Sequence, residues 1–414
     1  MNNLLAVSWE MPPLSGPRAV QVTRTLCQLA TLGWRSRVVC FGPRSTRYNQ
    51  DYDVSPEAET EGAVRLIRVP SPEEWFVFRV LWRVVPALKH LPDEKRLWIG
   101  GAVRAARAAL AEAPADLLVS FAQPWSDHLT GLALHRQTGL PWVAHFSDPW
   151  TDSPYRSGAP WQRRIWQRME HDVIAAATRI VFVNEPTADR VMAKYPADWR
   201  TRVRIVPQGF DNATTTPSGP RTAGPLRLVY TGRFYDGVRT PETMLDALAA
   251  LHRRAPIDTR LHVEFVGGAM EAYQRGAAEL GLSAVVSFTG RMSPQRAHEA
   301  ASGADVLVLI DAPSDGPNLF LPSKLVDYLP LRKPILGLTP AAGASADLLR
   351  KLGYPIVDPA NAGAIEQVLL TLIDAHERGT LQLSSAHDEV SRGYDIRETT
   401  AAFHGILLEA IGAA

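Results

Sequence analysis

Cysteine is scarce in this sequence, with only Cys27 and Cys40 among 414 residues. Two cysteines at this spacing make neither a set of metal ligands nor a disulfide framework. Both lie in apolar stretches, so we expect two buried free thiols. Free thiols are typical of a reducing compartment, which predicts a cytoplasmic location.

Long apolar runs and a targeting segment are also missing. The first residues, MNNLLAVSW, lack the basic start and long apolar stretch of a signal peptide, and we expect them to form a buried strand. No uninterrupted apolar run approaches the roughly 20 residues that span a bilayer. We therefore expect a soluble cytoplasmic protein whose closest membrane association is peripheral, at the inner face of the cell membrane.

An excess of one charge is absent as well. The net charge of +1 argues against a nucleic-acid-binding protein. Tryptophan is missing from the second half, because all 11 lie between Trp9 and Trp199. Basic residues outnumber acidic ones over residues 1–205, and acidic residues outnumber basic ones over residues 206–414. Two halves with different compositions predict two regions with different functions.

Short apolar strands alternate with amphipathic helices along the whole chain. This pattern indicates parallel sheets covered on both faces, in two doubly wound, Rossmann-like α/β domains. Residues 212–225 are rich in Pro, Gly, Thr and Ser and precede a new strand, as a linker would. We predict domains over residues 1–205 and 206–393, followed by a helix over 394–414. The expected strands are 4–9, 36–42, 64–69, 116–121, 142–147, 180–184 and 203–209, then 226–232, 262–268, 285–290, 305–311, 334–339 and 355–358.

Ligands of open α/β sheets bind beyond the carboxyl ends of the strands. After the first strand, Gly16 precedes a helix whose backbone N–H groups can bind an anion, although a plain strand–helix connection is equally compatible. The segments 120–131 and 143–155 also follow strands, and His145 and Asp148 are candidates for chemistry. A packed core histidine and a turn aspartate remain the alternatives. Asp51, Asp53 and Asp152 are weak evidence for a metal, and we expect none.

The second half offers a stronger set of loop residues. Gly232 ends a strand and Arg233 and Arg239 follow, close to the next helix. Two guanidinium groups there suit a diphosphate, since arginine binds phosphate through two hydrogen bonds. The alternative is a pair of solvated surface arginines.

A second cluster lies at the start of a short helix predicted at Pro322 and Ser323. Lys324 adds a positive charge in the first turn, and Asp327 lies one turn later on the same face. A carboxylate so placed can accept both hydrogen bonds of a ribose diol. The alternative is a Lys–Asp ion pair on an ordinary surface helix.

Several segments share an order and spacing with a known family. They are MPPLSGPRAVQVTRTLCQLATLG, DPW, VPQGFD, YTGRF, FVGG, VSFTGRMS and LPSKLVDYLPLRKPIL. Over nearly its whole length the chain resembles the retaining nucleotide-sugar glycosyltransferases of family 4. The resemblance implies the GT-B architecture, in which two Rossmann-like domains face each other across a cleft, and a terminal helix that crosses back to the first domain.

The resemblance also implies roles for particular residues. In that family a basic pair binds the donor diphosphate, and a loop after the VSFTG strand holds the base. Two glutamates seven residues apart contact the sugar and the ribose; the second matches Asp327, but the first falls on Leu319, which cannot hydrogen-bond. Asp311, Asp315 or the backbone of 319–322 are possible substitutes. The implied nucleotide-sugar-binding residues are Gly16, Gly232, Arg233, Arg239, Arg291, Met292, Leu321, Pro322, Ser323, Lys324 and Asp327, and the candidates for catalysis are His145, Asp148, Arg233 and Lys324.

The implied reaction moves a sugar from a nucleoside diphosphate, with uridine as the expected base, to an acceptor hydroxyl in bacterial envelope glycan or glycoconjugate synthesis. Side-chain cations stabilise the leaving group, so neither a metal nor another cofactor is expected. Aromatic and basic residues interleave over 73–91, which suits a polyprenyl-linked acceptor and an anionic membrane surface, although a buried helix pair, with tryptophans in the core, is the favoured alternative. Leu319 also fits a catalytically silent partner subunit, and a nucleotide-sugar epimerase is a third interpretation.

Overall fold

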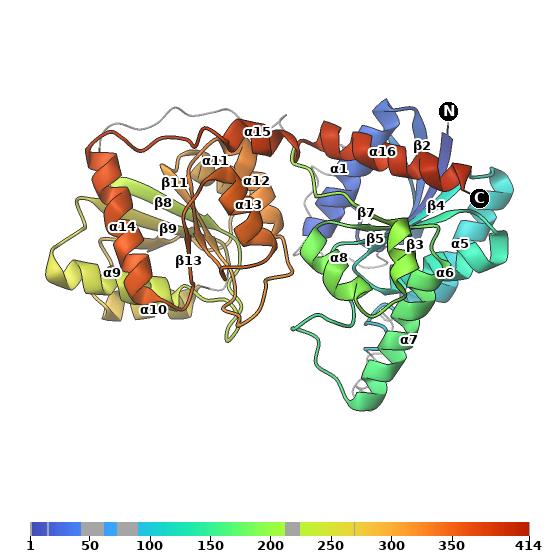
Figure 1. Cartoon of the computed structure of the whole chain (residues 1–414), viewed down its shortest axis with the longest axis horizontal. Coiled ribbons are helices and arrows are strands. Elements are labelled where there is room, and N and C mark those ends of the chain that lie inside the picture. The colour runs from blue at the N-terminus through green and yellow to red at the C-terminus, as the bar shows by residue number, and fades with distance from the viewer. Residues whose placement is uncertain are drawn as a thin grey trace. The chain divides into compact units, whose positions relative to one another are not determined.

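The computed structural model describes residues 2–14, 16–42, 62–72, 90–211, 224–268 and 270–413. The chain divides into two compact units. The first unit comprises Met1–Gly209 and Ile396–Ala414, and the second comprises Phe210–Asp395 (Figure 1). The divisions therefore lie after residues 209 and 395, where the sequence suggested 205 and 393.

The first unit is built on a parallel sheet with the strand order β3-β2-β1-β4-β5-β6-β7. Its strands are nearly continuous runs of buried apolar residues, as expected for a sheet covered on both faces. Their bounds are β1 (Asn2–Val7), β2 (Trp34–Phe41), β3 (Val64–Val69), β4 (Leu117–Ala122), β5 (Trp142–Phe146), β6 (Arg179–Phe182) and β7 (Val203–Ile205).

Helices cover both faces of this sheet. Alternate strand residues point to opposite faces, so Leu4 and Leu5 belong to two different cores. Helices α1 (Pro17–Thr31) and α16 (Ile396–Gly412) pack on one face, and α5 (Trp98–Glu112), α6 (Ser126–Thr138) and α7 (Pro160–Ala176) on the other. A shorter helix, α8 (Glu185–Met192), and the 3-10 helix η3 (Ala197–Arg202) precede β7.

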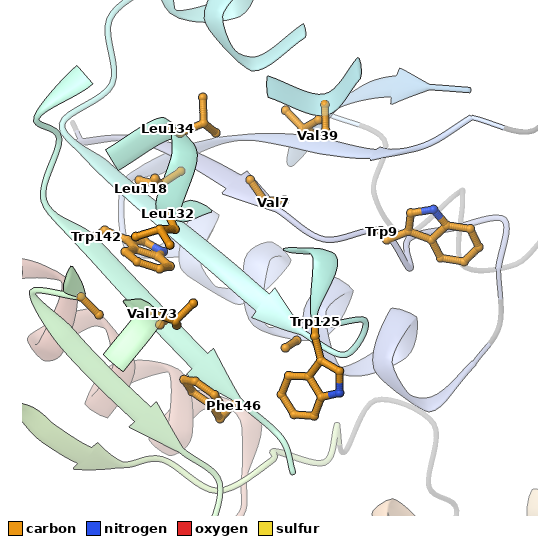
Figure 2. Packing of buried hydrophobic residues seen from close by; sticks show 14 of the residues in the cluster. Val7, Trp9, Val39, Leu118, Trp125, Leu132, Leu134, Trp142, Phe146 and Val173 are labelled. Atoms are coloured by element: carbon orange, nitrogen blue, oxygen red, sulfur yellow. The ribbon is translucent and has the colours of Figure 1, made fainter. Parts of the chain in front are cut away.

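Tryptophan side chains fill much of the first unit's interior. Trp98, Trp142 and Trp150 are completely buried, and Figure 2 shows Trp125 and Trp142 among the aliphatic side chains of this core. Among the tryptophans that the structure describes, Trp161 is 43% exposed and Trp199 is half-buried. The uneven distribution of tryptophan therefore reflects packing for the most part, and does not by itself mark a functional surface.

The second unit contains a parallel sheet with the order β10-β9-β8-β11-β12-β13. The strands are β8 (Leu226–Thr231), β9 (Leu261–Val266), β10 (Val286–Phe288), β11 (Val306–Ile310), β12 (Ile335–Leu338) and β13 (Ile356–Val357). Helices α9 (Glu242–Arg254), α10 (Glu271–Glu279) and α14 (Ala362–Glu377) contribute to one core. The other core includes α11 (Pro294–Ser302), α12 (Ser323–Tyr328) and α13 (Ala344–Leu352), with the 3-10 helix η5 (Leu329–Leu331) and α15 (His387–Arg392) beside it.

The structure also bears on the cysteines and on individual segments that the sequence singled out. Residues 126–131, expected in a loop, form the start of α6. Cys40 is buried, and burial raises its thiol pKa to about 12, but Cys27 is only half-buried. Within the described parts of the chain, no helix combines the length and apolarity needed to cross a membrane. Most of the segment 73–91 lies outside the described residues.

Candidate functional site

Each unit brings its candidate residues to the carboxyl ends of its parallel strands. In the second unit, glycine residues form this edge. Gly232, Gly267 and Gly290 follow β8, β9 and β10, and hydrogen bonds connect Gly232 N to Val266 O (2.8 Å) and Gly267 N to Gly290 O (3.1 Å). The φ of Gly267 is +155°, and a Cβ there would lie only 2.0 Å from the carbonyl oxygen of Gly232. The three strand ends can approach this closely only because glycine occupies the contact.

Three cations gather next to this glycine edge. Lys324 Nζ donates to the hydroxyl of Tyr230 (2.7 Å) and lies 3.9 Å from the centre of its ring. A Cβ on Gly232 would lie 2.5 Å from the same Nζ, so Lys324 lies directly beside Gly232. Arg239 Nη2 donates to the carbonyl oxygen of Arg233 (2.9 Å), while the Arg233 side chain is exposed. The structure thus brings Gly232, Arg233, Arg239 and Lys324 together, as the sequence predicted for a diphosphate site.

Two of these cations, Arg239 and Lys324, interact electrostatically with the buried Asp311 without forming an ion pair with it. Arg233, Arg239 and Lys324 form no ion pair in the described part of the chain, and the hydrogen-bond acceptors of Arg239 and Lys324 are a backbone carbonyl and a phenol oxygen. Burial, followed by the charge of Arg239, lowers the pKa of Lys324 well below its usual value. An anion at this edge would relieve that effect, because it favours the charged ammonium.

The other residues predicted for the site in the second unit differ in how deeply they are buried. Arg291 lies next to the glycine edge, since its Cβ is 3.8 Å from where a Cβ on Gly268 would be. Pro322 and Ser323 begin the short helix α12, which also carries the half-buried Asp327. Leu321 is a buried core residue, and Met292 packs against the same core. The burial of its side chain favours a contact of Leu321 with a ligand through its backbone, as proposed for residues 319–322.

Asp311, an expected substitute for the missing glutamate at Leu319, has hydrogen-bond partners within the protein. Its Oδ2 accepts hydrogen bonds from Asn318 Nδ2 and Thr339 Oγ1, both 2.9 Å away, and burial raises its pKa. The carboxyl group is 3% exposed and braces the loop before α12. Asp315, the other expected substitute, is exposed in this loop.

In the first unit, His145 and Asp148 lie at and just beyond the end of β5. Arg18, from the first turn of α1, donates through Nη2 to His145 Nδ1 (3.1 Å) and to the His145 carbonyl oxygen (3.2 Å). Asp148 Oδ2 accepts from Ser147 Oγ and Gln123 Nε2, both at 3.0 Å. Burial lowers the pKa of His145 well below its usual value and raises that of Asp148. The two predicted residues are thus neighbours with separate hydrogen-bond partners.

A carboxylate of the protein itself lies beside Gly16, where the sequence predicts an anion-binding site. Gly16 precedes α1 as its N-cap, and a Cβ on it would lie 2.8 Å from Glu10 Oε2. An incoming anion would be repelled there unless Glu10 moved or took up a proton, which argues against Gly16 as part of a diphosphate site. Burial raises the pKa of Glu10, whereas the charges of Arg18 and Lys95 lower it.

The aspartates considered for a metal either have other partners or lie outside the described residues. Asp152 forms ion pairs with Lys194 and Arg190. Asp51 and Asp53 belong to a segment that the structure does not describe. No group of three or more His, Cys, Asp or Glu side chains in the described ranges is arranged to hold a metal ion.

Sequence reasoning missed three residues that shape these edges. Arg18 looked like one of many arginines on an amphipathic helix, although its place two residues after Gly16 puts it in the first turn at a strand end. Tyr230 was grouped with its strand's apolar residues, and its hydroxyl position could not be foreseen. Asp127, which nothing in the sequence singles out, is fully buried in α6 and accepts a hydrogen bond from Trp9 N (2.8 Å).

Comparison with known proteins gives an independent view of the whole chain. Residues 18–209 match a family model described as Glycosyl transferase 4-like domain. No curated protein matches the chain significantly in sequence. Solved structures similar to it include sucrose-phosphate synthase from Thermosynechococcus elongatus (TM-score 0.72, 16% identity, 100% of both chains). Others are HepE from Anabaena in complex with UDP-glucose (0.68, 14%, 98% of this chain and 99% of that one) and WaaG, a glycosyltransferase involved in lipopolysaccharide biosynthesis (0.62, 15%, 98% and 99%). At these identities the structural matches establish the fold.

Proposed function

We propose that this chain, a family 4-like glycosyltransferase of GT-B type, is a retaining enzyme that uses a uridine-diphosphate sugar and glycosylates a hydroxyl of a glycan or lipid-linked acceptor. Two solved structures of one relative by fold support a nucleotide-sugar donor, since HepE was crystallised with UDP and with UDP-glucose. WaaG, which shares the fold, is involved in lipopolysaccharide biosynthesis, and this agrees with a role in envelope glycan synthesis.

The observation that carries this proposal is the set of unpaired cations in the second unit. Lys324 lies beside Gly232, Arg233 follows that glycine and Arg239 donates to the Arg233 carbonyl, and none of the three forms an ion pair with a carboxylate of the described residues. A diphosphate carries the complementary charge, and close backbone approach is what the glycines allow. We therefore assign the donor to this unit and the acceptor to the first unit.

The reaction breaks the bond between the anomeric carbon and the diphosphate oxygen. A bond from the acceptor oxygen to the same carbon forms on the same face, so the anomeric configuration is retained. The departing phosphate oxygen takes the acceptor's proton. Arg233, Arg239 and Lys324 would stabilise the charge that develops on the leaving group, an effect that is commonly the largest in such reactions. His145 or Asp148 would orient the transferred sugar, and these side-chain cations make a metal unnecessary.

A membrane-linked acceptor would require a surface that meets anionic lipids. Beside the end of the predicted segment 73–91, the indole Nε1 of Trp166 in α7 donates to His90 O (2.8 Å). The N-terminal part of α7, which projects from the unit in Figure 1, exposes Trp161 together with Arg164 and Arg168 on one face. No acidic residue lies in its first turn. Aromatic and basic groups in this arrangement suit an anionic membrane interface.

The lipid contact can be tested with vesicles of phosphatidylglycerol and phosphatidylcholine. Replacing Arg164 and Arg168 by Gln should weaken the free energy of binding to these vesicles by about 2 kcal/mol, since each basic group near the surface contributes about 1 kcal/mol. In a cosedimentation assay this corresponds to a roughly 30-fold lower affinity. Arg104→Gln with Arg107→Gln on α5 is a matched control. Absence of wild-type binding, together with efficient transfer to a soluble acceptor, would contradict the lipid-linked acceptor.

The donor site can be tested by turnover of UDP-sugars by the Arg233→Ala and Asp327→Ala variants. Loss of Arg233 should cost on the order of 2–4 kcal/mol of transition-state stabilisation. Arg275→Ala, an exposed arginine of α10, is the control and should turn over like the wild type. Near wild-type rates for both site variants would overturn the assignment.

One observation favours a second candidate, a catalytically silent partner subunit. Leu319 stands where the family has a glutamate, and Asp311 is occupied in bracing its loop. A silent subunit would bind the nucleotide without turnover. An epimerase would make product with no acceptor present, so assays with and without acceptor separate all three functions.

A further inference from the structure

Arg18 and His145 form a buried pair in the first unit. Their exposed fractions are 8% and 9%, and Nη2 of Arg18 lies 3.1 Å from Nδ1 of His145. The same Nη2 donates to the His145 carbonyl oxygen at 3.2 Å, so the guanidinium is held at two points of one residue. Such a double contact fixes the guanidinium against the ring.

Aromatic rings enclose the pair on two sides. The Phe121 ring of β4 lies 5.5 Å from the Arg18 guanidinium carbon and 5.2 Å from the His145 ring. Phe403 of α16 meets the imidazole edge-on, with the ring centres 5.7 Å apart. The imidazole therefore has little freedom to turn, and its orientation relative to Arg18 is maintained by packing.

The chemistry of the contact decides where the imidazole carries its proton. A guanidinium has N–H donors and no acceptor, so Nδ1 of His145 must present a lone pair to Arg18. The ring is then neutral, with its proton on Nε2. Burial and the positive charge of Arg18 lower the pKa of His145 well below its usual value, and nearby His128 acts in the same direction.

Arg18 itself keeps its charge in this setting. Burial lowers its pKa to about 10, while Asp148, Asp127 and Glu10 raise it, so the guanidinium is charged at neutral pH. The carboxylates compensate Arg18 without replacing its contact to His145. A charged donor thus faces Nδ1 at neutral pH.

We propose that Arg18 is a positioning residue that locks His145 in the Nε2–H form, so that His145 donates a hydrogen bond to a substrate oxygen and does not act as a base. The role in transfer rests on the function proposed above, but the position of the proton is a property of the resting protein. Both residues line one small pocket of the first unit, between α1, residues 206–209 and α16, together with Gln21, Gln208 and Thr399. An oxygen acceptor, such as a sugar hydroxyl or ring oxygen, is the group that Nε2–H would bind there.

Histidine ¹⁵N NMR of the full chain tests the inference without any variant. At pH 7 the two-bond ¹⁵N–¹H pattern of His145, assigned with His145→Gln, should show a protonated Nε2 and an unprotonated Nδ1. His145 should also remain unprotonated as the pH is lowered to about 5.5, a unit below the usual histidine value. A protonated Nδ1, or a charged ring at pH 7, would overturn the proposal.

Variants at position 18 then test the cause. Arg18→Met should mix the two tautomers and let His145 titrate at higher pH, whereas Arg18→Lys, which keeps a charged donor, should restore much of the wild-type pattern. Arg35→Met, an exposed arginine of the same unit, is the control. An unchanged His145 spectrum in a folded Arg18→Met protein would refute the proposal.

Transfer rates separate this inference from the proposed function. With the tautomer lost in Arg18→Met, kcat should fall about tenfold or more while KM for the donor changes little, by analogy with other buried groups that hold an imidazole's tautomer. A lost tautomer with an unchanged kcat would support the Arg18 role and count against His145 in transfer.

Discussion

The two units balance the charges at their strand ends in opposite ways. In the first unit the buried cation Arg18 is surrounded by carboxylates that raise its pKa, and it donates to a neutral histidine. In the second unit Arg239 and Lys324 donate to a carbonyl and a phenol oxygen, and the buried Asp311 interacts with both electrostatically without forming an ion pair. A compensated edge suits a neutral ligand such as a sugar hydroxyl, whereas an edge with more cations than nearby carboxylates suits an anion.

The two edges also differ in what holds them together. Side chains hold the first edge, where the Phe121 ring packs against Arg18 and His145, and Trp125 stacks on Trp150. Backbone holds the second edge, where Gly232 and Gly267 touch directly. The first edge should therefore be sensitive to substitutions that change hydrogen bonding or charge. The second edge should be sensitive to replacement of a glycine by alanine, which adds only a Cβ.

The largest effect is expected for Gly267→Ala in the second unit. Its Cβ would overlap the carbonyl oxygen of Gly232 at 2.0 Å, in a backbone conformation that disfavours side chains. We expect the free energy of unfolding of this unit to fall on the order of 3 kcal/mol, with loss of UDP-sugar binding. Because all tryptophans lie in residues 1–199, tryptophan fluorescence should report an unchanged first unit while the far-ultraviolet circular dichroism transition shifts.

Gly237→Ala is the matched control for that experiment. Its φ is +70°, but no atom lies within 4 Å of the added Cβ. It should cost about 1 kcal/mol, the penalty of the left-handed conformation alone. Equal stability of the two variants would show that the glycine contact does not hold the second edge.

A smaller effect is expected from acid on the first unit. His128 is fully buried, and burial and then Arg18 lower its pKa well below its usual value. Because the folded pKa lies below the unfolded value near 6.5, the stability is complete above pH 6.5 and is lost as the pH falls below it. At pH 5.5, His128 should lower the free energy of unfolding by about 1.4 kcal/mol relative to its value above pH 6.5. Urea unfolding followed by tryptophan fluorescence measures this change.

His128→Asn should remove this part of the pH dependence. The wild-type Nδ1 lies 2.8 Å from Ser120 Oγ, which itself accepts from the Trp142 indole, so an asparagine oxygen can accept from the same hydroxyl. Replacement of the exposed His171 on α7 by Asn is the control, and it should leave the slope of the free energy of unfolding against pH unchanged. A His128→Asn slope equal to that of the wild type would contradict the assignment of the acid sensitivity to this residue.

The sequence was sufficient for the elements that repeat a simple pattern. Buried runs such as 142–147 and 305–311 predicted strands, because a parallel strand covered on both faces is apolar throughout. The carboxyl-end rule then indicated Arg233 and Lys324 as neighbours, although about 90 residues separate them. The structure brings both residues to the same edge.

Side-chain partners could not be predicted in the same way. Nothing in the segment around Gly16 reveals that Glu10 lies against it, because the contact depends on how a loop with two adjacent prolines turns. The Arg18–His145 pair joins residues 127 positions apart, on a helix and a strand whose register no local pattern specifies. Asp311 looked available for a ligand until its contacts to Asn318 and Thr339 were visible.

The smallest effect is expected for Asp148→Asn, which distinguishes the two candidates of the first unit. An asparagine oxygen can still accept from Ser147 and Gln123, so the free energy of unfolding should change by less than about 1 kcal/mol. If His145 is the group that contacts the sugar, kcat should fall no more than about threefold, far less than in His145→Ala. A loss in Asp148→Asn as large as that in His145→Ala would instead show that the Asp148 charge is required, and that the compensated edge does more than position its histidine.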